Sequence, residues 1–383
     1  MDIKEKITGN EILFNLHHDN YLSTGILKEY SFKAGESTYP RTRKGKVTAK
    51  SPSNIALIKY WGKYPKQIPA NPSISYTLRQ CHSETQLYYQ FQKNRREKFS
   101  VQLLFAGEIQ PKFLPKILDF FEKILPYCPY LYDFDFIIKT NNTFPHSSGI
   151  ASSASAMSAL ALCLLQLEQK LGHVLSTEDC LQKASFLSML GSGSACRSIY
   201  PGLVIWGAHK AIKGSDDYYA IPYPYEIHEA FSSFQDTILL IDEGVKKVSS
   251  SQGHELMQQH PYAQKRFESA YENLERLIPI LKTGDLESFG ELVEHEALSL
   301  HAMMMCSRPY FILMKPDTLQ VIEKVWDFRI RTGKPLYFTL DAGANVHLLY
   351  PTKEKEMIHP FIHEELLLHC QRGHYIEDSC GYS

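Results

Sequence analysis

A lysine inside an apolar stretch is the first candidate for chemistry in this chain. Residues 54–63 read NIALIKYWGK, so Lys59 interrupts an apolar run and Lys63 follows Gly62 at a turn. One interpretation is a strand that ends in lysines whose charged groups reach solvent. The other places Lys59, Tyr60 and Lys63 at the edge of a cleft, where they face anionic groups of a substrate. This segment by itself leaves both interpretations open.

A loop of small side chains precedes a predicted helix. Residues 141–153 are dense in Asn, Ser, Pro and Gly, and the loop ends in GIASSAS at 149–155. Apolar residues then recur at helical spacing, at Met157, Leu160, Ala161 and Leu164. A helix N-terminus presents unpaired N–H groups and a partial positive charge, so this loop is a candidate for holding nucleotide phosphates. The alternative is an ordinary serine N-cap. Neither a Walker A loop nor a G-x-G-x-x-G fingerprint is present.

A second glycine- and serine-rich segment, GSGSACRSIY at 191–200, contains one arginine, Arg197. It is not a nucleophile elbow, because Gly193 stands where G-x-S-x-G requires Ser. A guanidinium fork binds carboxylate or phosphate with two hydrogen bonds, and neighbouring hydroxyls add neutral donors. The segment therefore suits an anion-binding site, although a flexible turn with a surface arginine fits equally well.

Asp341 stands where a predicted strand meets the turn DAGAN at 341–345. Either this residue only forms the turn, or the strand end presents its carboxylate at a cleft. A further serine-rich turn, KKVSSSQG at 246–253, precedes another predicted helix. We expect no metal-ligand array among the sixteen histidines, because Ser299 interrupts the H-E-x-x-H pattern begun at His295. We interpret His295 and His301 as ordinary polar or core histidines.

The elements that must position these residues alternate between strands and helices. Alternating and apolar runs predict strands at 85–91, 99–105, 134–139, 202–207, 236–242, 335–340 and 347–350. Helical spacing predicts a helix whose apolar face is Ile117, Phe120, Phe121, Ile124 and Leu125 and which Pro126 ends, a helix at 177–190 with Ser176 as its N-cap, and helices at 263–282, 285–307 and 316–332. The aromatic and proline-rich residues 208–234 mark a domain boundary. We expect an N-terminal extension at 1–45, an N-terminal domain at 46–230 and an α+β C-terminal domain at 231–383.

The composition is that of a soluble globular protein. The 383 residues are 44% hydrophobic and 22% charged, with a formal net charge of −1, so no basic field attracts nucleic acid or anionic membrane. No apolar run reaches the ~20 residues of a membrane span. The eight cysteines include no C-x-x-C pair, and the N-terminus lacks the order of a signal peptide. We expect a reducing, cytoplasmic location.

Four separated stretches together resemble one family. They are SPSNIALIKYWGK (51–63), PHSSGIASSAS (145–155), GSGSACRS (191–198) and DAGAN (341–345). In this order they resemble the diphosphomevalonate decarboxylase family of the GHMP kinase superfamily. The resemblance implies an α+β, GHMP kinase-like two-domain fold, with a ribosomal S5 domain 2-like N-terminal domain, a ferredoxin-like C-terminal domain and an active site between them. It implies a homodimer as well.

The resemblance also implies a reaction and its reagents. ATP, with Mg2+ bridging its phosphates, would phosphorylate the 3-hydroxyl of mevalonate 5-diphosphate, and loss of phosphate and CO2 would give isopentenyl diphosphate. Asp341 matches the catalytic aspartate that takes the hydroxyl proton. Lys59 matches the lysine beside it, which favours charge on the transferred group. Arg197 matches the arginine that grips the substrate carboxylate.

The remaining implied site residues bind ligands. Those that match substrate-binding positions are Asn54, Tyr60, Lys63, Ser192 and Ser194, in addition to Arg197. Those that match ATP-binding positions are Gly149, Ser152 and Ser153, with Ser249 and Ser250 from the second domain. No protein residue is expected to be a dedicated metal ligand, since Mg2+ needs few protein ligands when phosphates hold it.

Three other functions stay open. A phosphomevalonate decarboxylase acting on the 5-monophosphate would share Asp341, Lys59 and Arg197. A mevalonate 3-kinase would phosphorylate without decarboxylating, and it would lack part of that set. A non-catalytic binding protein on the same scaffold would lose its charged groups first. Retention of all three residues favours decarboxylation.

Overall fold

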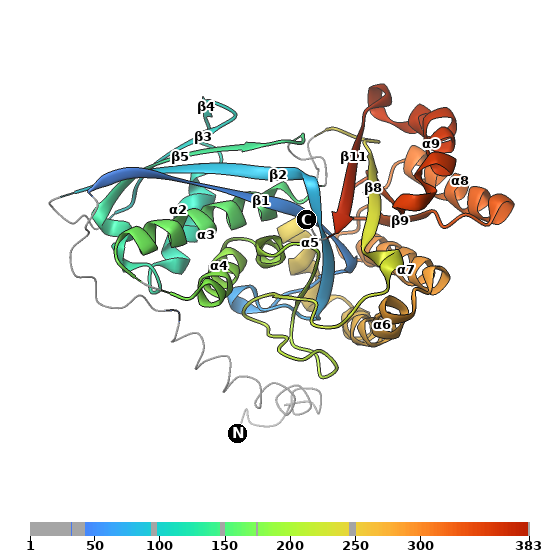
Figure 1. Ribbon diagram of the computed structural model, residues 1–383, viewed down its shortest axis with the longest axis horizontal. Coiled ribbons are helices and arrows are strands. Elements are labelled where there is room, and N and C mark those ends of the chain that lie inside the picture. Colours follow the sequence, from blue (N-terminus) through green and yellow to red (C-terminus); the bar gives the residue numbers. More distant parts are fainter. Residues whose placement is uncertain are drawn as a thin grey trace, which may run out of the picture.

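The computed structural model describes residue 32 and residues 43–92, 98–145, 150–173, 175–244 and 250–381 (Figure 1). Most of the predicted N-terminal extension therefore lies outside the described residues. Phe32 is an exception, because its ring stacks on Phe186 at 4.9 Å and meets the edge of Tyr219 at 6.2 Å. This contact fixes one point of the extension to the core of the first domain.

The described strands form one mixed sheet. They are β1 (Lys44–Ile58), β2 (Ser73–Phe91), β3 (Ser100–Phe105), β4 (Glu108–Ile109), β5 (Phe134–Asn142), β6 (Leu203–Trp206), β7 (Ile221–Pro222), β8 (Ser233–Leu239), β9 (Tyr337–Leu340), β10 (Val346–Pro351) and β11 (Tyr375–Gly381). The main order is β4-β3-β5-β2-β11-β8-β10-β9, and both β1 and β6 also pair with β2. Only β3 and β5 run parallel to each other among these pairs.

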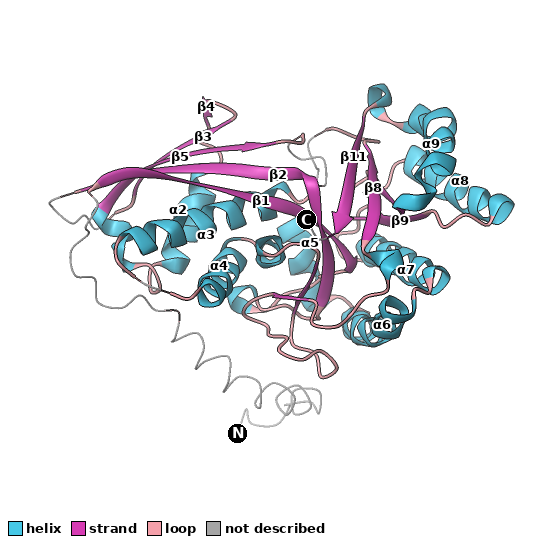
Figure 2. Ribbon diagram, viewed as in Figure 1, coloured by secondary structure: helices cyan, strands magenta, loops and turns pink. Residues whose placement is uncertain are grey.

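The helices gather in two groups, one beside each half of the sheet (Figures 1 and 2). The first group is α2 (Leu114–Ile124), α3 (Ser152–Lys170) and α4 (Thr177–Gly191). The second group is α6 (Ala263–Thr283), α7 (Leu286–Met305), α8 (Pro316–Thr332) and α9 (Lys355–Phe361), and α5 (Ser250–Leu256) lies near the middle of the molecule. Within the described residues no helix is both long and apolar enough to cross a membrane. The expected α+β class is confirmed.

Local signals account for the first group of helices. The apolar face predicted for α2 is buried at Ile117, Phe120, Phe121 and Ile124 against the sheet. The predicted N-cap of α4 is confirmed, because the Ser176 hydroxyl accepts a hydrogen bond from the backbone of Asp179 at 3.1 Å. These two helices and α3 enclose the main core of the first domain.

The two halves of the sheet join through β11, a strand that sequence patterns did not predict. β11 pairs along β8, and its Cys380 is opposite Leu78 of β2. The buried Asp378 carboxylate of β11 accepts backbone N–H groups from residues 79, 80 and 81 at 2.9, 2.8 and 2.6 Å. A carboxylate with several backbone donors is well satisfied when buried, so this contact ties the C-terminal strand to the first domain.

Candidate active site

A lysine and an aspartate from opposite halves of the chain meet at the ends of two strands. Lys59 directly follows β1 and Asp341 directly follows β9. Lys59 Nζ lies 3.6 Å from Asp341 Oδ1, with side-chain exposures of 2% and 32%. Within the described part of the chain Lys59 Nζ makes no hydrogen bond, so a buried ammonium retains unused donors. Burial lowers the pKa of Lys59, whereas the charges of Asp341 and Glu296 oppose that shift.

Arg197 lies beside this pair and is also buried. It belongs to a short 3-10 segment, Gly193–Ile199, and its guanidinium stacks near the Trp206 ring at 5.9 Å. It donates to Ser73 Oγ and, at 3.4 Å, to Asn54 Oδ1. Burial lowers the pKa of Arg197, and the nearby Asp341 charge raises it. Among the described residues its hydrogen-bond partners are all neutral, and a buried guanidinium of this kind is suited to an anionic ligand.

Asn54 holds the loop that carries Arg197. Its amide donates to Ser198 Oγ at 2.8 Å and to the Ser194 carbonyl at 3.4 Å. The pairing of β1 with β2 shifts register between Pro52 and Asn54, and such irregularities commonly re-aim side chains near functional sites. The geometry therefore places the predicted residues Asn54 and Ser194 in this cluster, with Asn54 bonded to Arg197 itself.

Tyr60 lies between two rings, with its centroid 4.7 Å from Trp206 and 4.2 Å from His254. Burial raises the pKa of Tyr60, and the Arg197 charge opposes that rise. Gly193 makes the position possible, because a Cβ there would lie 2.7 Å from the Tyr60 hydroxyl oxygen. The predicted substrate-binding residue Tyr60 therefore contacts the segment that carries Arg197.

The serine-rich loop ends without a side-chain cap. The N-cap position of α3 is Ala151, at φ 39°, and an alanine side chain cannot accept a hydrogen bond. This observation disfavours the simple N-cap interpretation and leaves the helix N-terminus suited to an anion. Ser153 Oγ lies 3.5 Å from Ser192 Oγ, so the loop meets the segment that precedes Arg197. Gly149 lies outside the described residues, and Ser152 is the first residue of α3.

Sequence patterns missed a cation at this loop. Lys116 of α2 donates from Nζ to Ser153 Oγ. The Lys116 side chain is exposed, yet desolvation by the surrounding groups lowers its pKa, and the charges of Lys123 and Lys63 lower it further. Burial likewise lowers the pKa of Lys63, against the charge of Glu255. Several ammonium groups beside an uncapped helix N-terminus form a field suited to phosphate, and no motif distinguished Lys116 from a surface lysine.

The second domain contacts the same segment through α5. The backbone N–H of Gly62 donates to His254 Nδ1 at 2.9 Å, and burial lowers the pKa of His254 to about 3. The imidazole is therefore a neutral acceptor at this position. Of the two serines predicted to bind ATP from this domain, Ser249 lies outside the described residues and Ser250 begins α5. Their ligand role stays a prediction.

A buried carboxylate on α7, that of Glu296, holds the backbone of Lys59 by a hydrogen bond. Glu296 accepts the Lys59 backbone N–H at 2.9 Å, Arg266 Nη2 at 2.6 Å and Asn273 Nδ2 at 2.7 Å. From the same helix, His301 Nε2 lies 3.0 Å from the backbone carbonyl of Asp341. We expected His301 to be an ordinary polar or core histidine. The structure agrees, since His301 is buried and bonded to a backbone carbonyl, and α6 and α7 together hold the backbones of both strand ends.

Replacing Glu296 by Gln should destabilise the fold and lower activity. The amide NH2 would face donors from Arg266, Asn273 or Lys59, and Arg266 would lose its buried counter-ion. Breaking a buried pair costs about 3–5 kcal/mol in the free energy of unfolding, which urea unfolding measures. Glu268→Gln on α6 is the matched control, because the exposed Glu268 contacts the surface residues Lys265 at 3.4 Å and Gln264 at 3.1 Å. Unfolding of Glu296→Gln at the wild-type urea concentration would show that the contact is dispensable.

The fold and the site together define a class of protein. A two-domain α+β architecture, in which the serine-rich N-terminus of α3 contacts the segment that leads to Arg197 and in which Lys59 and Asp341 meet, is that of the GHMP kinase-like proteins. The profile "Diphosphomevalonate decarboxylase-like N-terminal domain" matches residues 51–219. The profile "Mevalonate 5-diphosphate decarboxylase C-terminal domain" matches residues 237–379.

Solved and curated relatives agree with the profiles. A mevalonate diphosphate decarboxylase structure from Staphylococcus aureus is 30% identical, with a TM-score of 0.75 over 88% of this chain and 96% of that one. The Enterococcus faecalis enzyme is 26% identical, with a TM-score of 0.73 over 88% and 97%. Diphosphomevalonate decarboxylase of Ganoderma lucidum is 28% identical over 82% of this chain and 80% of its own length. The chain belongs to the mevalonate diphosphate decarboxylase family.

Proposed function

We propose that the Lys59–Arg197–Asp341 cluster catalyses the ATP-dependent decarboxylation of mevalonate 5-diphosphate to isopentenyl diphosphate. One observation carries the proposal. The buried Lys59 ammonium, which makes no hydrogen bond to any described residue, lies 3.6 Å from a half-exposed carboxylate. In phosphoryl transfer to a hydroxyl, a positioned base takes the hydroxyl proton, and a positive charge stabilises the negative charge of the transferred phosphoryl group. A relative that is 28% identical has been solved with MVAPP, AMPPCP and magnesium.

The first step is phosphorylation of the tertiary hydroxyl. Asp341 accepts the hydroxyl proton while the oxygen forms a bond to the γ-phosphorus of ATP, and the bond from that phosphorus to the bridging oxygen breaks to release ADP. Lys59 stabilises the negative charge on the transferred group. The N-terminus of α3, with Ser152, Ser153 and Lys116, supplies donors for the ATP phosphates. Bound Mg2+ would neutralise phosphate charge, and Asp341 is the carboxylate of the cluster that could face it.

The second step is elimination from the phosphorylated intermediate. The carbon–oxygen bond breaks, and its electron pair leaves with phosphate. The electron pair of the bond to the carboxylate carbon becomes the new double bond, and CO2 departs. Arg197 is buried and held by Asn54 and Ser73, so it can fix the carboxylate in line with the departing phosphate. Fixing this alignment couples the two bond cleavages.

A different set of residues would bind the phosphate end of the substrate, which is a diphosphate or a monophosphate. We assign Tyr60, Lys63, Ser192 and Ser194 to the diphosphate of the substrate. Two observations support this assignment: a Cβ on Gly193 would lie 2.7 Å from the Tyr60 hydroxyl oxygen, so Tyr60 is close to this segment, and Ser192 lies 3.5 Å from Ser153. A monophosphate substrate would leave part of this set unused.

Product analysis with ATP and Mg2+ tests the function. Mevalonate 5-diphosphate and mevalonate 5-phosphate are offered in parallel, and ADP, phosphate and CO2 are measured together. Equal amounts of all three from the diphosphate alone are the expected result. Preference for the monophosphate would require new roles for Tyr60, Lys63 and Ser192. Formation of ADP without CO2 would make the protein a kinase and contradict the role of Arg197.

Three organisational expectations accompany this function. We propose a homodimer in the cytoplasm, with the domain boundary near residue 230. The eight cysteines are free thiols, which is compatible with a reducing compartment. Sedimentation equilibrium at several protein concentrations measures the oligomeric state.

A further inference from the structure

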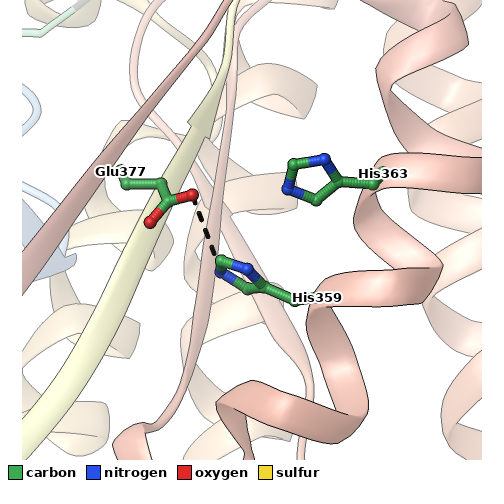
Figure 3. A group of neighbouring side chains, drawn as sticks. All are labelled: His359, His363 and Glu377. Atoms are coloured by element: carbon green, nitrogen blue, oxygen red, sulfur yellow. Dashed lines mark ion pairs between the residues drawn. The ribbon is translucent and has the colours of Figure 1, made fainter.

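Three side chains of the second domain, none of them assigned to catalysis, converge at its surface (Figure 3). They are His359 on α9, His363 on the π-helical turn Ile362–Leu366 and Glu377 on β11. One ligand atom from each lies within 4.8 Å of the others. The closest measured approach is 3.9 Å, from His359 Nε2 to Glu377 Oε1, and the two imidazole centroids are 5.4 Å apart.

The local backbone explains why the two histidines meet. Residues four apart on a helix lie on one face, so His359 and His363 project to the same side. A π-helical turn begins at Ile362, between them, and single π turns inside helices occur frequently at functional sites. The carboxylate comes from a different element, since β11 runs beside this helix and presents Glu377 toward both rings.

Nearby polar groups contact these side chains but leave part of their hydrogen-bonding capacity unused. Lys355 Nζ lies 3.0 Å from Glu377 Oε2, which leaves Oε1 on the side of His359. The Tyr375 hydroxyl lies 3.4 Å from both Glu377 Oε1 and His363 Nε2. These contacts are long except for the lysine pair, so a competing ligand would displace weak bonds. Lys355 is the one cation paired with Glu377 among the described groups, and its charge opposes a second cation.

We propose that His359, His363 and Glu377 form a binding site for a divalent transition-metal ion. Two imidazole nitrogens and one carboxylate oxygen are a ligand set that suits Zn2+ or Ni2+ and disfavours Mg2+ or Ca2+. Bond lengths of ~2.0–2.2 Å require the ligand atoms to draw closer together by about 1 Å. Because the His363 and Glu377 side chains are exposed, rotation about their side-chain bonds can supply this movement.

A metal ion bound at this site would stabilise the folded protein and would take no part in the catalytic steps. In the described part of the chain, none of the three residues bonds to Lys59, Arg197 or Asp341. The ion would join α9 to β11, the strand that connects the two halves of the sheet. Binding to the folded state alone stabilises it by mass action. The expected readout is therefore thermal stability and metal affinity, with turnover unchanged.

Calorimetric titration of the untagged, nucleotide-free full-length chain with Ni2+ tests the proposal. One ion should bind per chain, and saturating Ni2+ should raise the midpoint of thermal unfolding. His359→Ala and His363→Ala should each weaken binding by about tenfold or more and abolish the midpoint shift. His374→Ala is the matched control, because His374 forms a similar pair with Glu243 at 2.6 Å without a third ligand in the described chain. It should bind Ni2+ as the wild type does.

A variant that is expected to bind Ni2+ more tightly than the wild type provides a second test. Lys355→Met removes the cation beside Glu377 and should tighten Ni2+ binding severalfold. Absence of Ni2+ binding in the wild type would overturn the proposal. So would equal affinities in the wild type, His359→Ala and His363→Ala, because binding would then occur elsewhere. Weaker binding by Lys355→Met would contradict the assignment of Glu377 as a ligand.

Discussion

Replacing Asp341 by Asn should lower turnover by roughly 10³-fold while the protein still folds. The amide cannot accept the proton of the substrate hydroxyl, and loss of a general base costs about 10²–10⁴-fold. A second effect adds to the first. The Asp341 charge opposes the lowering of the Lys59 pKa by burial, so its loss lowers that pKa further and favours the uncharged amine. The backbone contact with His301 does not depend on the carboxylate.

Steady-state release of ADP measures this effect, and urea unfolding shows that the variant is folded. Asp317→Asn is the matched control, because Asp317 pairs with His369 on the surface of α8. That control should keep wild-type turnover. Wild-type-like activity in Asp341→Asn would refute the assignment of this residue as the base.

Replacing Arg197 by Ala should lower kcat/KM for the decarboxylation substrate by about 10²–10³-fold. Truncating one partner of a buried, hydrogen-bonded charge pair costs about 2–5 kcal/mol, and the substrate carboxylate would lose its partner here. The ATP affinity should change little, since the groups assigned to the phosphates are Ser152, Ser153 and Lys116. Less CO2 should be released per ADP formed, because the carboxylate is no longer aligned with the departing phosphate.

The ratio of CO2 to ADP separates this role from a structural one. Arg329→Ala is the matched control, because Arg329 forms a two-pronged pair with Glu294 at 2.7 and 3.0 Å in the second domain. That variant should be less stable and keep a CO2-to-ADP ratio equal to that of the wild type. A collapse of ATP affinity alone in Arg197→Ala would show that the arginine faces the nucleotide.

Short-range patterns in the sequence correctly predicted the helices of the first domain and one helix cap. Apolar spacing identified α2, α3 and α4, and the predicted N-cap Ser176 caps α4. These predictions succeed because helix spacing and capping depend on residues close in the chain. Length was predicted less well: the run at 85–91 is the end of the longer strand β2, Ser73–Phe91. Pairing with β1 and β5 extends the strand, and a local window does not contain those partners.

The proposed reacting groups were identified from the sequence by itself. Lys59, Arg197 and Asp341 stand in stretches specific enough to name, and the structure brings Lys59 and Asp341 within 3.6 Å. The sequence left two meanings for the serine-rich loop. The tertiary structure favoured one, because Ala151 occupies the cap position and Lys116 of α2 reaches Ser153.

Only the tertiary structure decided which side chains support these groups. Glu296 looks like any helical glutamate in the sequence, yet the fold buries it beneath Lys59 with Arg266 and Asn273. Glu377 acquires two histidine neighbours only because β11 packs beside α9. The physical reason is common to both cases. The charge state and the partners of a side chain depend on residues far away in the chain. Local sequence patterns contain no information about those contacts.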